Sequence, residues 1–321
     1  METIGTPWMW TGFTVLVILA LFVDLVMLRQ KGPHRISTGE ALRWSLFWIA
    51  VALVFNLALW WYLRGQLGPE EGRRLALEFL TGYVVEKALA VDNIFVFLLL
   101  LNYFAVPAEQ RQRVIIYGVL GAIVLRGIMI FLGAALIQQF HWILYLFGLF
   151  LALTGLKMLF KGDEDPDLDA NPLLRWITAH LPLTRSYHGS ALWIHDQGKR
   201  LFTPLFVVIA MLGITDLIFA VDSIPAIFAI TLDPFIVLTS NVFAVLGLRA
   251  LFFLLAGAAD RFHLLAYGLA LVLLFIGIKM LIMDIFHIPV AISLSVVVLL
   301  IGSSIVVSLM FPKKDEEPPA A

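Results

Sequence analysis

The sequence predicts an all-α polytopic membrane protein with about nine transmembrane helices that contain an inverted 3+3 repeat. Of the 321 residues, 61% are hydrophobic and only 14% are charged, and the mean hydropathy is +0.95. Soluble domains do not have such a composition. The apolar residues form long, continuous runs without alternation, which indicates helices instead of strands. A motif with two carboxylates inside an apolar run occurs twice.

The apolar runs define the organisation of the chain. Each predicted span is long enough to cross a hydrocarbon core of about 30 Å, and the spans are 7–28, 41–63, 75–102, 113–138, 141–160, 203–232, 235–258, 263–284 and 289–311. We expect two N-terminal helices, a first repeat unit, a hydrophilic loop, a second unit, a ninth helix and a disordered tail, with the bounds 1–74, 75–160, 161–202, 203–284, 285–311 and 312–321.

Basic residues predict the orientation. Most of the 22 lysines and arginines follow the odd-numbered spans or lie in the tail. The positive-inside rule therefore places the N-terminus outside and the C-terminus in the cytoplasm. No Lys or Arg precedes the first run, so we expect an uncleaved first helix.

We predict that the 161–202 loop is a solvated cytoplasmic linker. Its acidic run, Asp163 to Asp169, resembles the start of a calcium loop, but Ala170 stands where Gly is needed and Trp176 where the bidentate Glu is needed. Leu173 to Leu181 has the character of a short interfacial helix. Trp193 to Phe202 predicts a small hairpin.

The duplicated acidic motifs are the most informative feature of the sequence. The first holds Glu86 and Asp92, and the second holds Asp216 and Asp222. The spacing within each pair is the same, Ala-Val precedes the second acid in both, and a constant offset relates the pairs. An ionised carboxylate at membrane depth costs several kcal/mol unless it is paired, protonated or bound to a cation.

The repeat extends beyond the acids. Arg126 in the fourth span matches Arg249 in the seventh, and Gly155 to Leu159 matches Gly277 to Leu281. Spans 3–5 therefore correspond to spans 6–8. Because each unit has an odd number of spans, the two units cross the membrane in opposite senses. Inverted repeats of secondary transporters place the binding site near the bilayer midplane, between the repeats.

The donor chemistry points to a hard divalent cation. Four carboxylates suit Mn²⁺, Mg²⁺ or Ca²⁺ better than Cu or Zn, which prefer His or Cys, and the chain has no Cys. Asn93 and Ser223 follow the second acids and offer neutral oxygen atoms. These residues form the predicted metal site, with Mn²⁺, Mg²⁺ or Ca²⁺ as the transported ion and no resident cofactor.

Geometry requires a bend if both acids of a motif are to face one cation. Two positions six residues apart lie about 120° apart around an ideal helix. Pro225 lacks an N–H group and frees the carbonyl of Val221, beside Asp222. We therefore expect a helix break there.

The charge balance of the acidic motifs supports exchange of a metal ion for protons, but it also allows a purely structural role for the acids. The four acids carry −4 when ionised, Arg126 and Arg249 carry +2, and one divalent cation would neutralise the set. In the absence of metal, protonation would have the same effect. Alternatively, the acids form structural ion pairs with Arg126, Arg249 and Lys87. In either case, these three basic residues are charge partners or gating residues.

The motifs Glu86 to Asn93 and Asp216 to Ala226 resemble those of the TerC family, and Gly5 to Pro7 together with Thr231 to Arg249 is similar to its Alx branch. The resemblance covers nearly the whole chain. It implies a multi-pass protein of the bacterial inner membrane, within the LysE-like transporter group, that exports manganese with the four acids as ligands. Family labels also include tellurium resistance and redox modulation. Without cysteine, the redox label has no thiol mechanism here.

Two other classes of function compete with metal transport. A scaffold or metal-delivery partner would use the 161–202 loop, with secretion-machinery or homo-oligomer contacts. A membrane enzyme would need a nucleophile–base constellation or a phosphate loop, and neither is present, so we expect no enzyme activity. A net charge of −1 says nothing about acidic partners, and we expect no nucleic acid among the partners. The partners that remain are a divalent metal ion and the lipid bilayer.

Overall fold

The computed structural model describes residues 3–31, 38–140, 142–161, 179–184, 186–189, 191–196, 199–255, 264–286 and 288–311. Within these ranges, some side chains, including those of 24–31, Asp92 and Asp222, lie outside the description. The elements, in order, are α1 (Pro7–Lys31), α2 (Thr38–Leu67), α3 (Pro69–Tyr103), α4 (Ala108–Gln139), α5 (Ile143–Lys161), β1 (Trp193–Asp196), β2 (Lys199–Phe202), α7 (Pro204–Phe228), α8 (Pro234–Val245), α9 (Leu248–Leu255), α10 (Leu265–Leu281) and α11 (Val290–Met310).

The predicted all-α membrane fold is confirmed. In the described ranges, five helices are long and apolar enough to cross a membrane, and six are if the bent pair α8 and α9 is one span. Two shorter apolar helices, Pro7–Val23 and Leu265–Leu281, accompany them. The count of nine spans stays a prediction. So do the domain bounds.

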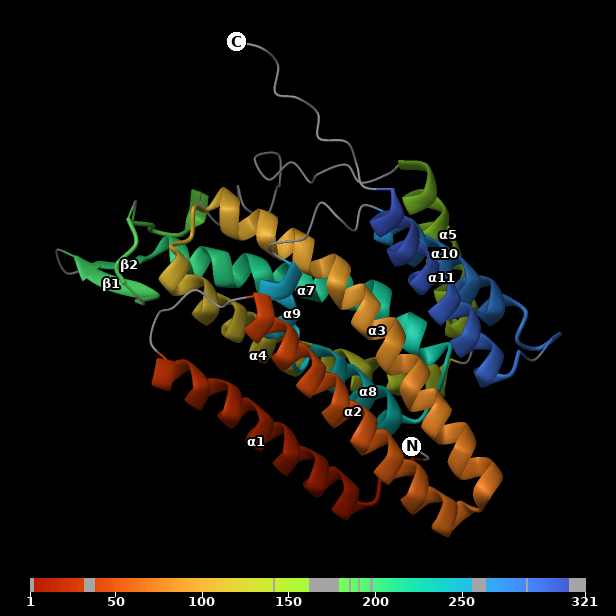
Figure 1. Cartoon of the computed structure of the whole chain (residues 1–321). Coiled ribbons are helices and arrows are strands. Elements are labelled where there is room, and N and C mark those ends of the chain that lie inside the picture. Colours follow the sequence, from red (N-terminus) through yellow and green to blue (C-terminus); the bar gives the residue numbers. More distant parts are fainter. Residues whose placement is uncertain are drawn as a thin grey trace.

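Helix packing brings the two predicted units together. The helix α3 packs against α8, α4 against α7, and α5 against α10. Figure 1 shows the β1–β2 hairpin at one end of the molecule and α5, α10 and α11 gathered at the other, with α1 along the edge. Each unit thus packs its helices mainly on those of the other unit. The inverted repeat itself stays a prediction.

Two glycines at matching positions of the predicted repeat bring α5 and α10 into backbone contact. A Cβ on Gly155 would lie 2.6 Å from the Ala270 carbonyl oxygen, and a Cβ on Gly277 would lie 2.5 Å from the Ala152 nitrogen. Only small residues allow helices to approach this closely in a membrane. The contacts are reciprocal, since each glycine faces the segment that precedes the other.

The broken helix is not where the sequence placed it. We expected a break at Val221 and Pro225, but α7 runs on through Pro225 to Phe228. Proline removes one hydrogen bond near the end of this helix, a loss that membrane helices tolerate. The break instead divides the predicted span 235–258 into α8 and α9, which are bent by 41° at Leu246 and Gly247.

The predicted hairpin is confirmed, and the segment that precedes it covers the ends of several helices. Trp193 pairs with Phe202, and Asp196 with Lys199. Leucines from 181–192 and Tyr187 pack on the core formed by the ends of α3, α4, α7 and α9. The Tyr187 hydroxyl donates to the Phe104 carbonyl at 2.7 Å, and burial raises the pKa of this phenol. The acidic run and most of the Leu173–Leu181 segment lie outside the described residues.

Replacing Tyr187 with phenylalanine should loosen this cover. The substitution removes one hydrogen bond to a helix-end carbonyl, so we expect a loss of about 1 kcal/mol in the free energy of unfolding in detergent. Tyr117→Phe, at an exposed position on α4, is the control and should have no measurable effect. Equal stability of the two variants would show that the Tyr187 contact does not hold this segment on the helix ends.

Candidate functional site

A buried polar cluster lies where four helices meet. Glu86 comes from α3, Arg126 from α4, Asp216 from α7 and Asn241 from α8. Each of these residues is at most 4% exposed. Glu86 and Asp216 are the first acids of the two duplicated motifs, so the fold brings together residues that are far apart in the sequence.

One guanidinium group joins both acids. Arg126 forms an ion pair with Glu86, and its Nη2 lies 3.1 Å from Asp216 Oδ1. Its Nε donates to Asp216 Oδ2 at 3.4 Å. A buried ionised carboxylate is stable only when a counter-charge balances it and its lone pairs accept hydrogen bonds. Arg126 therefore has the predicted position of a charge partner to both motifs.

Asn241 closes the network. Its Oδ1 accepts a hydrogen bond from Arg126 Nη1 at 3.2 Å, and its Nδ2 donates to Glu86 Oε2 at 3.2 Å. Sequence reasoning assigned no role to Asn241. Its neighbours Thr239 and Ser240 donate to carbonyls of their own helix, whereas an amide in an apolar helix needs external partners. An Asn within an apolar run was the available signal.

The cluster carries an excess of negative charge. Two carboxylates face one guanidinium, which leaves a formal charge of −1 among these three side chains. Such an excess at membrane depth is neutralised by a proton, a metal ion or a further basic side chain. The site can therefore hold a proton on one carboxyl group or attract a metal ion.

The second acids lie on the same two helices. The backbones of Asp92 and Asp222 belong to α3 and α7, and their side chains lie outside the described residues. The neighbouring Asn93 and Ser223 are 6% and 2% exposed, and the Ser223 hydroxyl has no hydrogen-bond partner among the described atoms. Among the described side chains, no group of three or more His, Asp or Glu residues can hold a metal. The predicted four-acid site thus stays a prediction.

The other two predicted basic residues have different surroundings. Arg249 is buried in the first turn of α9. Lys87 donates from Nζ to the carbonyls of Ala244 at 3.0 Å and Leu246 at 3.4 Å. Its described partners are therefore backbone oxygens at the end of α8, where we had expected carboxylates.

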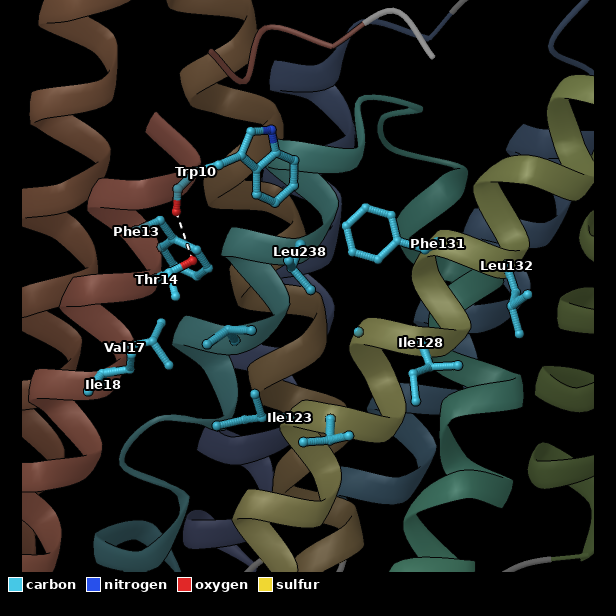
Figure 2. A pocket seen from close by; sticks show the side chains of 13 residues that line it. Trp10, Phe13, Thr14, Val17, Ile18, Ile123, Ile128, Phe131, Leu132 and Leu238 are labelled. Atoms are coloured by element: carbon cyan, nitrogen blue, oxygen red, sulfur yellow. Dashed lines mark hydrogen bonds between the residues drawn. The ribbon is translucent and has the colours of Figure 1, made fainter. Parts of the chain in front are cut away.

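A separate pocket of about 630 Å³ opens between α1, α4 and α8. Figure 2 shows the side chains that line it, including Trp10, Phe13, Leu238 and Phe131. The Thr14 hydroxyl is turned back onto the Trp10 carbonyl at 2.8 Å. The lining is otherwise apolar and includes no carboxylate, so this pocket suits hydrocarbon and not a cation.

Comparison with known proteins decides the family. The profile described as "Integral membrane protein TerC family" matches residues 71–316. The chain belongs to the TerC family. The matched range begins at α3, so α1 and α2 lie before the part described by the TerC profile.

Several TerC-like relatives resemble almost the entire chain. A protein from Salmonella typhi, with the provisional name "membrane-bound redox modulator Alx", is 53% identical over 297 residues, which cover 92% of each chain. A protein of the same name from Photorhabdus laumondii is 49% identical and covers 98% of each chain. An uncharacterised membrane protein from Myxococcus xanthus is 44% identical. No solved structure matches this chain significantly.

Proposed function

We propose that this protein is a secondary transporter that exports a divalent metal ion, Mn²⁺, in exchange for protons. The observation that carries the proposal is the excess negative charge of the buried cluster, in which Glu86 and Asp216 share the single guanidinium of Arg126. The remaining acids, Asp92 and Asp222, lie on the same helices. A cation that can enter and leave is a direct reason for such a cluster in a membrane.

In this proposal, Arg126 is the internal cation of the metal-free state. It holds Glu86 and Asp216 in place until the metal arrives. For all four acids to bind one ion, the guanidinium must withdraw from Glu86 and Asp216, because both carboxylates now direct oxygen atoms at it. Metal binding and movement of α4 relative to α3 and α7 are then coupled. Ca²⁺ and Mg²⁺ are the competing ions, since they also prefer oxygen ligands.

The family and the distribution of basic residues support the proposed membrane and orientation of the protein. The relatives are bacterial, which favours the inner membrane. The lysine and arginine distribution favours an external N-terminus. Transport, and not catalysis, is then the activity to measure.

Mn²⁺ flux into reconstituted vesicles is the decisive experiment. We expect Asp92→Asn and Asp222→Asn to lower the flux at least 100-fold, because each removes a charged ligand. The matched control is Asp284→Asn, an exposed acid that pairs with Tyr145, and it should transport as the wild type does. Wild-type flux from both site variants would refute the carboxylate site.

Proton coupling needs its own arm of the experiment. With the membrane voltage clamped, an inward proton gradient should increase Mn²⁺ efflux. Indifference to the gradient would refute exchange while leaving metal transport intact. An absence of flux under every gradient would favour the scaffold alternative. In that case, deletion of 161–202 should abolish function, whereas Asp92→Asn should not.

A further inference from the structure

The break between α8 and α9 is built into the fold. The chain turns by 41° between Val245 and Leu248. Gly247 has φ +80°, in the left-handed region that favours glycine. The Trp48 ring of α2 lies 2.6 Å from the place where a Cβ on Gly247 would stand. Both the backbone conformation and the packing therefore require glycine at this position.

A helix end at membrane depth leaves backbone carbonyls that need donors. The Lys87 ammonium of α3 supplies them, at 3.0 Å from the Ala244 oxygen and 3.4 Å from the Leu246 oxygen. In transporters with discontinuous helices, such carbonyls coordinate cations. Lys87 places a tethered cation at the same kind of position.

Lys87 also links the break to the polar cluster. Its neighbour Glu86 accepts from Asn241, which lies on α8 shortly before the break. Arg249 follows the break within the first turn of α9. Two adjacent residues of α3 thus bind α8: Glu86 at the side-chain amide of Asn241, and Lys87 at the C-terminal carbonyls. Because Arg249 lies in the first turn of α9, the direction of α9 sets the position of Arg249.

We propose that Lys87 is a latch that holds the α8–α9 break in its bent form and thereby positions Arg249. Lys87 is a positioning residue, and its ammonium substitutes for a bound cation at the carbonyls of Ala244 and Leu246. The latch goes beyond metal export, because it assigns a conformational role to a residue outside the metal site. Loss of the ammonium should free α9 to reorient and uncover its buried face.

The cysteine-free chain allows a direct test by thiol labelling. A single reporter, Ala250→Cys, sits on α9 at a position that is 6% exposed. In the full-length protein in detergent, we expect Lys87→Met to speed labelling by a small thiosulfonate reagent at least tenfold. Lys87→Gln keeps a shorter, uncharged donor and should give an intermediate rate, and it serves if the methionine variant does not fold.

Two controls separate the latch from general instability. The reporter Ala134→Cys, buried on α4, should label at the same slow rate in every variant. Lys157→Met removes an exposed lysine of α5 and should leave both reporters unchanged. An unchanged rate at position 250, or an equal rise at both reporters, would overturn the latch. Labelling requires no transport, so this outcome is independent of the export experiment.

Discussion

Arg126→Met is expected to lower the free energy of unfolding by about 3–5 kcal/mol, the range for removal of one partner from a buried ion pair. The substitution leaves Glu86 and Asp216 buried without their shared counter-charge. It also removes a donor to Asn241. Denaturant unfolding in detergent measures the change.

The matched control for this variant is Arg113→Met, an exposed arginine on the same helix. Surface substitutions of this kind usually stay within about 0.5 kcal/mol of the wild type. A loss below about 1 kcal/mol for Arg126→Met would contradict the buried network. Adding Glu86→Gln and Asp216→Asn to Arg126→Met should recover much of the stability, because no uncompensated charge then remains.

The neutral triple variant also separates structural ion pairs from a transport site. If Glu86 and Asp216 serve only to pair with Arg126, the stable triple variant should still move Mn²⁺. If both acids are ligands, it should fold and lose flux. Mn²⁺ flux on this one protein therefore decides between the two interpretations of the cluster.

Gly277→Ala is expected to cost about 2–3 kcal/mol, near the upper part of the range for overpacking. The added Cβ would lie 2.5 Å from the Ala152 nitrogen and 2.7 Å from the Gly148 oxygen, and backbone atoms cannot move aside as a flexible side chain can. The helices α5 and α10 must then separate. Unfolding in detergent gives the stability.

Gly121→Ala is the control, because nothing lies within 4 Å of its added Cβ. Gly155→Ala should resemble Gly277→Ala, since its Cβ meets the Ala270 oxygen and the Leu274 nitrogen. The double variant should cost less than the sum, because separation of the helices relieves both clashes. Full additivity would mean that the two glycines act independently.

Hydropathy predicted the helices of this protein well because long apolar runs have few alternatives in a membrane. The hairpin at Trp193 to Phe202 was also predictable, since its turn lies between two short strands with suitable residues. The duplicated motif predicted that Glu86 and Asp216 converge, and in the structure they meet on Arg126.

Tertiary packing determines the features that the sequence did not predict. Glycines are frequent in membrane helices, so Gly247 gave no specific sign of a break, whereas Pro225 did and was tolerated. Trp48, from a helix far away in the sequence, packs directly on Gly247 at the break. Charge matching assigned Lys87 to carboxylates, because the sequence did not show that a helix ends at Leu246 and leaves carbonyls without an intrahelical partner.

The interleaved packing of α3 on α8 and α4 on α7 has a consequence for synthesis in the cell. Arg126 is made 90 residues before Asp216, which corresponds to roughly 5–18 s at a translation rate of 5–20 residues per second. During that interval Glu86 is its available partner within the cluster, and α8 and α7, on which α3 and α4 pack, have not yet been made. The half of the chain that contains α3 and α4 must therefore remain in the bilayer without these partners until α7 and α8 are made. Two halves made as separate chains should assemble by the same route.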